Sequence, residues 1–339
     1  MFPPLRTVLI GMGKVGAGFA EDARLSRSYP YATHAQVLCE HPAYCWSAVV
    51  DPDPQVLRLA RERWRVPCVV GSIPELLSVC QPEVAVLATP PHLRWSLIEQ
   101  LPALRGILVE KPLANTVAEA SQLLEGCERR GIRVQVNLWR RADETCRALA
   151  AGRLTELIGR PQAIFSVYGN GLLNNGTHVV DLVRMLVGEV TGAQSVAGSA
   201  ACPAGPVPRD MQMPFNLLLD RGLVATFQPV GFEHYRENSL DIWGETGRLA
   251  ILREGLQVLH YRRQAHTALE GEREMDSETP SLLPATVGHA FYHMYTNLAD
   301  AIHGQADLWS PGESALRTGR VVEAVRQSQQ TNGSFIPCH

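Results

Sequence analysis

The sequence lacks the features that mark secreted and membrane proteins. No basic segment followed by a long apolar stretch stands at the N-terminus, where Met1–Arg6 leads directly into the apolar residues 7–10. No apolar run approaches the roughly 18–20 residues that a bilayer-spanning helix needs. None of the eight cysteines forms a Cys-x-x-Cys pair, and scattered cysteines in a long chain are typical of reduced thiols. We therefore expect a cytoplasmic protein with no membrane partner.

An excess of charge of one sign is also missing. The chain has 31 basic and 34 acidic residues and a net charge of −3, which gives no electrostatic reason to expect nucleic acid as a partner. Its 45% hydrophobic and 19% charged residues are ordinary for a globular protein. No internal repeat is found. A length of 339 residues favours two domains, which we expect to be residues 1–137 and 138–339.

The first part of the chain alternates short apolar runs with helical patterns. Strands are expected at 6–10, 47–50, 68–70, 84–88, 106–109 and 132–137, and helices at 54–65, 73–80, 91–101 and 116–130. Strands and helices that alternate in this way form parallel sheets with helices on both faces. The fold class predicted for this domain is therefore α/β, with the doubly wound sheet of a Rossmann domain.

The second part contains strand-like runs at 162–168, 217–219, 223–229, 239–243, 248–252 and 256–261. Helices are expected at 177–186, 289–303 and 312–329, and residues 193–209 and 263–283 are interpreted as loops. Consecutive strands joined by short turns indicate antiparallel pairing. We expect an α+β domain with a mostly antiparallel open sheet, and a last helix that packs back on the first domain.

The first motif is a G-x-G-x-x-G that directly follows the first expected strand, formed by Gly11, Gly13 and Gly16 with Lys14 and Val15 between them. Glycines at these positions permit a tight turn and close approach of the backbone to a pyrophosphate. The N–H groups at the start of the next helix are available to the anion. In this context the motif predicts a dinucleotide site, although a glycine-rich surface turn would look the same in isolation.

Asp51 stands at the end of the second expected strand. A carboxylate there accepts hydrogen bonds from ribose hydroxyls and repels a 2′-phosphate, which favours NAD over NADP. The alternative is that Asp51 caps the helix that begins near Pro54.

The distance between Gly16 and Asp51 is larger than the usual spacing of about 20 residues. The extra residues lie around 17–31. They form either a loop inserted near the cofactor or an extension of the helix to about Ser26, and we favour the loop.

Two further motifs carry polar groups suited to catalysis. Lys111, in Glu110-Lys111-Pro112, follows the fifth expected strand, and the carboxyl ends of such strands border the ligand crevice. His178 lies one turn into a helix after Asn174, and histidine accepts a proton near neutral pH. Taken singly, an ordinary surface lysine and a structural histidine are the simpler interpretations. We expect no metal site.

Taken together, these motifs resemble those of the Gfo/Idh/MocA oxidoreductase family along nearly the whole chain. The segments that carry the resemblance are the glycine motif, Ala88-Thr89-Pro90-Pro91-His92, Glu110-Lys111-Pro112, Asn137 with Arg140-Arg141, Gly176-x-His178-x-x-Asp181, and the pattern from Ala315-Leu316-Arg317 to Ser328.

The resemblance implies NAD-dependent hydride transfer to or from a sugar, cyclitol or sugar nucleotide. It implies that Lys111 and His178 are catalytic and that Asn174 orients His178 or the substrate. It also implies a homodimer or homotetramer formed through the C-terminal sheet. The expected cofactor contacts are Gly11, Gly13, Lys14, Val15, Gly16, Asp51, Thr89, Pro90, His92, Glu110 and Lys111. The expected substrate contacts are Asn137, Arg140, Arg141, Tyr168, Thr177 and Asp181.

The sequence departs from the family pattern in two places. Many members have aspartate where this chain has Asn174, and an amide only hydrogen-bonds where a carboxylate also adds charge. The histidine that usually follows the third glycine is displaced to His34, so we predict that Ala17–Ala32 forms a loop over the cleft. The alternative function is a dinucleotide-binding regulator without catalysis, which the family also contains.

Overall fold

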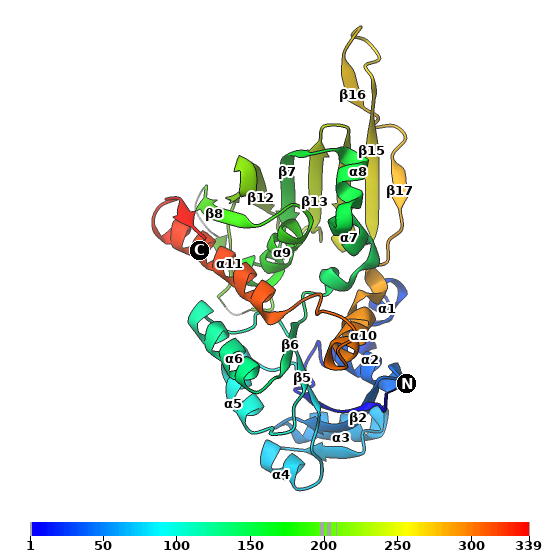
Figure 1. Ribbon diagram of the computed structural model, residues 1–339, viewed down its shortest axis with the longest axis vertical. Coiled ribbons are helices and arrows are strands. Elements are labelled where there is room, and N and C mark those ends of the chain that lie inside the picture. Colours follow the sequence, from blue (N-terminus) through cyan, green and yellow to red (C-terminus); the bar gives the residue numbers. More distant parts are fainter. Residues whose placement is uncertain (1, 197–199, 202–204, 208, 339) are drawn as a thin grey trace. The chain divides into compact units, whose positions relative to one another are not determined.

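The computed structural model describes residues 2–196, 200–201, 205–207 and 209–338. It divides into two compact units, Met1–Ala142 with Gly288–Leu316, and Asp143–Val287 with Arg317–His339 (Figure 1). This division differs from the expected one, because residues 288–316 group with the first unit. Cys202 and parts of the expected loop 193–209 lie outside the described residues. No helix of the described chain is long and apolar enough to cross a membrane.

The first unit contains a six-stranded sheet in which every pair is parallel, with the order β3-β2-β1-β4-β5-β6. The strands are β1 Leu5–Ile10, β2 Tyr44–Val50, β3 Cys68–Val70, β4 Val84–Leu87, β5 Gly106–Val109 and β6 Arg133–Val136. The order reverses between β1 and β4, and ligands bind at such a switch point, outside the carboxyl ends of the strands. The predicted Rossmann sheet is confirmed.

Helices cover both faces of this sheet. Apolar residues of α4 Ile73–Leu77, α5 Arg94–Glu99 and α6 Val117–Arg129 pack into one core cluster, and those of α2 His34–Glu40, α3 Pro54–Trp64 and α10 Ala290–Ile302 into another. Side-chain caps explain where several of these helices begin, because the caps accept hydrogen bonds from otherwise unpaired N–H groups. The capping residues are Thr33, Asp53, Ser72 and Thr116. The short helices of this unit are η1 Gly18–Glu21, α1 Leu25–Ser28, η2 Pro91–Leu93 and η3 Trp139–Ala142, and η8 Val287–His289 begins at its edge.

The segment after the glycine motif is a structured excursion. The chain makes one hydrogen-bonded turn after Gly13 and then leaves it to form η1 and α1. It returns at α2, where the N–H groups of His34 and Ala35 donate to the carbonyls of Val15 and Gly16 at 3.1 and 2.9 Å. The first helix of the Rossmann domain is thus interrupted by residues 17–33, so the expected break in the helix is confirmed.

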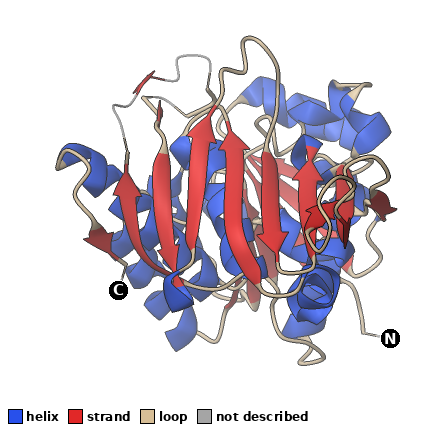
Figure 2. Ribbon diagram, turned by 90° about the horizontal axis from the view of Figure 1, so that it is seen from above, coloured by secondary structure: helices blue, strands red, loops and turns tan. Residues whose placement is uncertain are grey.

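The second unit contains a large mixed sheet with the order β16-β15-β14-β13-β7-β12-β11-β8-β18, and β17 pairs with β15. Every neighbouring pair is antiparallel except β12 with β7, which confirms the predicted mostly antiparallel sheet. Figure 2 shows its long strands side by side. The strands are β7 Pro161–Tyr168, β8 Val190–Ser195, β11 Phe215–Leu219, β12 Val224–Pro229, β13 Ser239–Gly244, β14 Gly247–Leu252, β15 Gln257–Ala265, β16 Arg273–Met275, β17 Ser281–Leu283 and β18 Ile336–Pro337.

Shorter elements complete the second unit. A separate pair is formed by β9 Ala200–Ala201 and β10 Met211–Gln212. The helices are α7 Glu144–Ala148, η4 Leu149–Arg153, α8 Leu154–Ile158, η5 Leu172–Gly176, α9 Thr177–Leu186, η6 Asp220–Gly222 and η7 Arg253–Gly255.

Two segments interpreted as loops contain strands, so these predictions were partly wrong. β8 extends to Ser195, β15 extends to Ala265, and β16 and β17 lie within 263–283. Figure 1 shows β15 and β16 as a hairpin that projects from the sheet. The outer residues of this hairpin are exposed on both faces of the strands, so no alternation of apolar and polar residues marks them.

One face of the large sheet is the core of the second unit. Apolar residues of α8, α9 and the later part of α11 Gly312–Gln330 pack against alternate strand residues, among them Ile164, Phe227 and Ile242. The other face carries the exposed side chains of Phe165, Val224 and Trp243. The last helix is shared, because its residues 312–316 group with the first unit and the remainder with the second.

Candidate active site

The three glycines of the motif have three different surroundings. Gly11 has a φ of +87°, and a Cβ there would lie 2.7 Å from the carbonyl oxygen of Ala88. A Cβ on Gly16 would lie 2.6 Å from Cα of Met12. A Cβ on the exposed Gly13, in contrast, would meet nothing within 4 Å. Gly11 and Gly16 therefore permit the turn. Gly13 leaves space in front of the turn, as close approach of a pyrophosphate requires.

The remaining residues of this loop are partly accessible. Lys14 is exposed and Val15 is half-buried, at the point where the first helical turn begins. The N–H groups of such a turn and an adjacent ammonium suit an anion. The loop therefore fits the phosphates of a dinucleotide.

Asp51 is tied to the glycine loop. Its carboxylate accepts hydrogen bonds from the backbone N–H of Met12 at 2.9 Å and of Asp53 at 3.0 Å. The cap of α3 is Asp53, which accepts from the N–H of Gln55 at 2.8 Å, so capping is not the role of Asp51. A carboxylate has about four acceptor positions. Asp51 therefore retains positions for the hydroxyls of a ribose.

The loop after β4 carries the next expected contacts. Thr89 is half-buried, and Pro90 and His92 are exposed. The hydroxyl of Thr89 is buried without a hydrogen-bond partner in the described structure. Its carbonyl accepts from Arg94, whose Nη2 lies 2.9 Å away.

Arg94 connects this loop with the Glu110-Lys111-Pro112 segment. Its guanidinium also donates to the carbonyls of Pro112 and Leu113, the latter at 3.1 Å. The side chain is buried, and burial lowers its pKa to about 10, while the charge of Glu110 opposes that shift. Nothing in the sequence pattern marks this residue, because a buried arginine at the start of a short helix looks like any surface arginine.

The side chain of Glu110 is held from two sides. Its Oε1 lies 3.1 Å from Nε2 of His34 and 2.5 Å from Nδ2 of Asn137. Burial by itself raises the pKa of Glu110, but the hydrogen bond and electrostatic attraction of His34, the hydrogen bond from Asn137 and the charge of Lys111 together outweigh burial, and the pKa lies below its ordinary value. Lys111 is half-buried and precedes a cis peptide bond to Pro112. An ionised carboxylate therefore stands directly before the lysine.

Residues after β6 border the same edge of the sheet. Asn137 is buried and supports Glu110 rather than facing open solvent. The guanidinium of Arg140 lies 4.5 Å from the ring centre of Trp139, and Tyr29 of the inserted segment meets Trp139 edge-on at 5.8 Å. Arg141 is half-buried. The structure therefore brings the insertion close to two of the expected substrate contacts.

In the second unit, His178 and Asn174 lie on either side of the start of α9. His178 is half-buried, whereas Thr177 and Val179 beside it are buried. The buried carboxylate of Asp210 accepts from the N–H groups of Leu173 and Asn174, each at 3.1 Å. Sequence reasoning missed Asp210, which follows a segment interpreted as a loop. Its charge at the beginning of the η5–α9 helix is a favourable anionic cap.

Three expected substrate contacts have structural partners. The hydroxyl of Tyr168 is buried between the backbone N–H and C=O of Met213. Thr177 donates to the carbonyl of Leu173 at 3.0 Å. Asp181 accepts from Thr318 at 2.8 Å and lies 3.5 Å from Arg184. These contacts stabilise the second unit, so we leave the three residues out of the substrate site proposed below.

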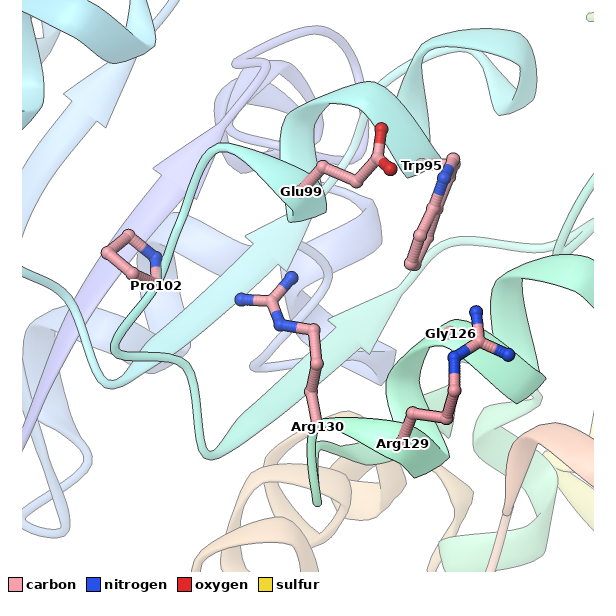
Figure 3. A pocket seen from close by; sticks show the side chains of 6 residues that line it. All are labelled: Trp95, Glu99, Pro102, Gly126, Arg129 and Arg130. Carbon is pink, nitrogen blue, oxygen red and sulfur yellow. The ribbon is translucent and has the colours of Figure 1, made fainter.

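A shallow hollow of about 410 Å³ lies elsewhere on the first unit (Figure 3). It is formed by α5, α6 and the turns that lead into β5 and β6, at the amino ends of these strands. Arg130 is tied there to the carbonyl of Ile98 at 2.8 Å. The hollow contains none of the expected site residues. The side chains that line it are Trp95, Glu99, Pro102, Gly126, Arg129 and Arg130. Among the described residues, no group of three or more His, Cys, Asp or Glu side chains could hold a metal ion.

Comparison with known families agrees with this geometry. Residues 5–138 match the model of an oxidoreductase family with an NAD-binding Rossmann fold, and residues 169–335 match the C-terminal alpha/beta domain of the same Gfo/Idh/MocA family. The chain belongs to this family. It is therefore an oxidoreductase, and its cofactor is NAD, as the resemblance implied.

Individual relatives differ in what they do. Over 269 residues, 74% of each chain, the protein is 25% identical to an inositol 2-dehydrogenase of Acidothermus cellulolyticus. A levoglucosan dehydrogenase in complex with NADH and levoglucosan shares the fold with a TM-score of 0.77 and 18% identity, over 99% of each chain. A super-repressor mutant of Gal80p from Saccharomyces cerevisiae also shares it, with a TM-score of 0.74 and 14% identity over 99% and 98% of the chains. Similarity of fold alone therefore does not separate enzyme from regulator.

Proposed function

We propose that this oxidoreductase is a dehydrogenase that transfers a hydride between a secondary hydroxyl carbon of a sugar, cyclitol or sugar nucleotide and NAD. The observation that carries the proposal is the position of Lys111. It follows β5 beside the hydrogen-bonded Glu110–Asn137 pair, at the same carboxyl edge as the glycine loop and Asp51. The names of the inositol and levoglucosan dehydrogenases support the substrate class.

The residues at this edge fit the cofactor. The open space at Gly13 suits the pyrophosphate, and Asp51 suits the adenosine ribose. When bound, NAD supplies the nicotinamide ring that accepts or returns the hydride. The loops with Thr89, Pro90 and His92 and with Glu110 and Lys111 would hold that ring in the proposal.

Each catalytic side chain has a separate role in the proposal. The ammonium of Lys111 donates a hydrogen bond to the reacting oxygen and stabilises its developing negative charge. An imidazole nitrogen of His178 accepts the hydroxyl proton during oxidation and returns it during reduction. Asn174 orients His178 or the substrate through its amide. Arg140 and Arg141 bind further oxygen atoms of the substrate.

The first experiment is a titration of cofactor-free protein with NADH and, in parallel, NADPH, followed by nicotinamide fluorescence. Tighter binding of NADH would justify a screen of cyclitols, sugars and sugar nucleotides with NAD. Failure of folded protein to bind either nucleotide would overturn the proposal.

Substitution of the catalytic residues tests the roles. We expect Lys111→Ala and His178→Ala each to lower kcat at least about 100-fold, the effect typical of one acid–base group, while NADH binding persists. His266→Ala changes a histidine of the projecting hairpin and serves as the control with unchanged turnover. Turnover near that of the wild type in Lys111→Ala or His178→Ala would remove that residue from the mechanism. NADH binding without turnover on any member of the substrate classes would favour the regulator.

We also propose a cytoplasmic homodimer or homotetramer assembled through the open face of the large sheet. The seven described cysteines are free thiols, which suits a reducing compartment. The exposed Phe165, Val224 and Trp243 gather apolar surface on the face opposite the core. Arg248 lies over the rings of Trp243 and Tyr261 at 4.5 and 4.7 Å and pairs with Asp241, which gives this face the mixed character of an interface.

A further inference from the structure

Two buried side chains, Tyr295 and His34, form a continuous hydrogen-bonded chain with the half-buried Glu110, the residue before the lysine. Oη of Tyr295 on α10 lies 2.7 Å from Nδ1 of His34, and Nε2 of the same ring lies 3.1 Å from Oε1 of Glu110. His34 and Tyr295 are fully buried. The three residues are far apart in the sequence, and none of the hydrogen bonds closes a turn or caps a helix. These hydrogen bonds therefore do more than pair the backbone groups of a turn or a helix end.

The partners of His34 indicate which of its ring nitrogens donates and which accepts. Nε2 faces a carboxylate, so it carries a hydrogen and donates. In the neutral ring Nδ1 is then an acceptor, and the phenol of Tyr295 donates to it. Burial raises the pKa of Tyr295 well above its ordinary value, which keeps the phenol protonated. The one anion of this buried chain is thus the carboxylate of Glu110.

The charge of Glu110 has two cations near it. Lys111 is its neighbour in the chain, and the charge of Arg94 also interacts with it. Arg94 is occupied by the carbonyls of Thr89, Pro112 and Leu113. Asn137 is the other donor to the carboxylate. Loss of the bond from His34 would leave Glu110 with one fewer donor in a buried position, which favours its neutral form.

We propose that His34 is a positioning residue for Lys111, because it keeps Glu110 ionised and fixed so that the ammonium of Lys111 stays charged and in place. This inference rests on the proposed function of Lys111. The path of the chain supports it. Residues 17–33 leave the first helix, but the bonds from the N–H groups of His34 and Ala35 to Val15 and Gly16 return the ring to one fixed position. The insertion therefore preserves His34 rather than displacing it from the site.

The scarcity of lysine gives a direct test. Lysine occurs only at Lys14 and Lys111 in the sequence. Competitive acylation with acetic anhydride, measured by mass spectrometry, therefore compares the reactivity of Lys111 with that of the exposed Lys14. The pH at the midpoint of Lys111 acylation gives its pKa without any substrate. In His34→Leu we expect this midpoint to fall by about one unit, equivalent to about tenfold faster acylation at pH 8. In His34→Gln, whose amide can donate to Glu110, we expect the midpoint to stay close to the wild-type value.

A matched control lies at the other end of the same helix, α2. His41 is also buried, and its Nε2 contacts Thr296 of α10 at 2.9 Å, but it does not reach Glu110. Burial and the nearby His293 lower the pKa of His41 to about 4, so it is neutral in the assay. His41→Leu should leave the Lys111 midpoint unchanged. If His34→Leu does not fold, Glu110→Gln removes the same charge and should lower the midpoint equally.

Kinetics supply a second readout. In His34→Leu we expect kcat to fall about tenfold with little change in KM for NAD, and the acidic limb of the pH profile to move to higher pH, because Glu110 then ionises later. An unchanged Lys111 midpoint in folded His34→Leu and Glu110→Gln would overturn the inference. A shifted midpoint in a protein that oxidises none of the substrate classes would retain the coupling and reject the proposed dehydrogenase activity.

Discussion

At the scale of single residues, the candidate site depends on side chains whose polar atoms serve two partners at once. Asp51 accepts from the glycine loop and from the start of α3, and Glu110 accepts from two different elements. Such carboxylates are fixed before any ligand arrives. Preorganised charge of this kind binds or stabilises without a further cost of reorientation.

Asp51 provides a prediction about cofactor choice. In Asp51→Asn one oxygen remains to accept a backbone N–H, but the negative charge is lost. We expect the preference for NADH over NADPH to fall at least about tenfold, since a hydrogen bond to a charged group contributes roughly 1.5–3 kcal/mol and repulsion of the 2′-phosphate disappears. Fluorescence titration with both nucleotides measures the ratio, and Asp53→Asn, the cap of α3, is the control. An unchanged ratio in Asp51→Asn would show that another residue sets the preference.

Sequence reasoning identified Lys111, Glu110 and Asn137 as site candidates, and the structure places them together. It could not find the partners that hold them. Tyr295 is 261 positions from His34 in the chain, and Arg94 acts on backbone carbonyls that have no residue identity. Contacts of this kind depend on the packing of α5 and α10 against the sheet, so no local pattern predicts them.

At the scale of elements, the strands of the first unit were predictable because most of their residues are buried, on both faces in β4 and β5, and because the strands end at turns or caps. The second unit was harder. β8 is short and rich in small and polar residues, and the outer part of β15 forms with β16 a charged hairpin without alternation. The hydrophobic pattern that marks a strand comes from burial of one face, so strands that project from the sheet lack it.

The inserted segment gives a prediction about an element. The N–H of His34 donates to the carbonyl of Val15, as the N–H four residues after Val15 would in a continuous helix. Removal of the 15 residues 18–32 should therefore join the two helical parts without moving His34. We expect the deletion variant to fold and to bind NADH within about threefold of the wild type. It should be less stable by about 1–2 kcal/mol, because the contact of Tyr31 with Tyr292 at 4.8 Å is lost.

Thermal unfolding and NADH titration of the deletion variant measure both quantities. Tyr31→Ala in the full chain is the matched control for the lost aromatic contact. A deletion variant that folds but no longer binds NADH would show that the insertion itself contacts the cofactor, which is the position over the cleft predicted from the sequence.

At the scale of the whole molecule, the open sheet face is the surface to test. An acidic residue in the centre of an apolar interface costs several kcal/mol when it is buried without a partner. We expect Phe165→Asp to lower the molar mass measured by light scattering to that of a monomer. Leu269→Asp at the tip of the hairpin, where the leucine is also exposed to solvent, is the control. A Phe165→Asp protein that keeps its assembly would exclude this face as the interface.

The location of the two lysines has a practical consequence. Lys14 lies on the glycine loop and Lys111 follows β5, so both side-chain amines belong to the same edge of the Rossmann sheet. Amine-directed chemistry, such as coupling to an activated resin or fluorescent tagging with succinimidyl esters, would have only these targets besides the α-amino group. Such treatment would modify the lysines of the candidate active site before any other side chain. Immobilisation or labelling should therefore use the exposed thiols of Cys39 or Cys45 instead.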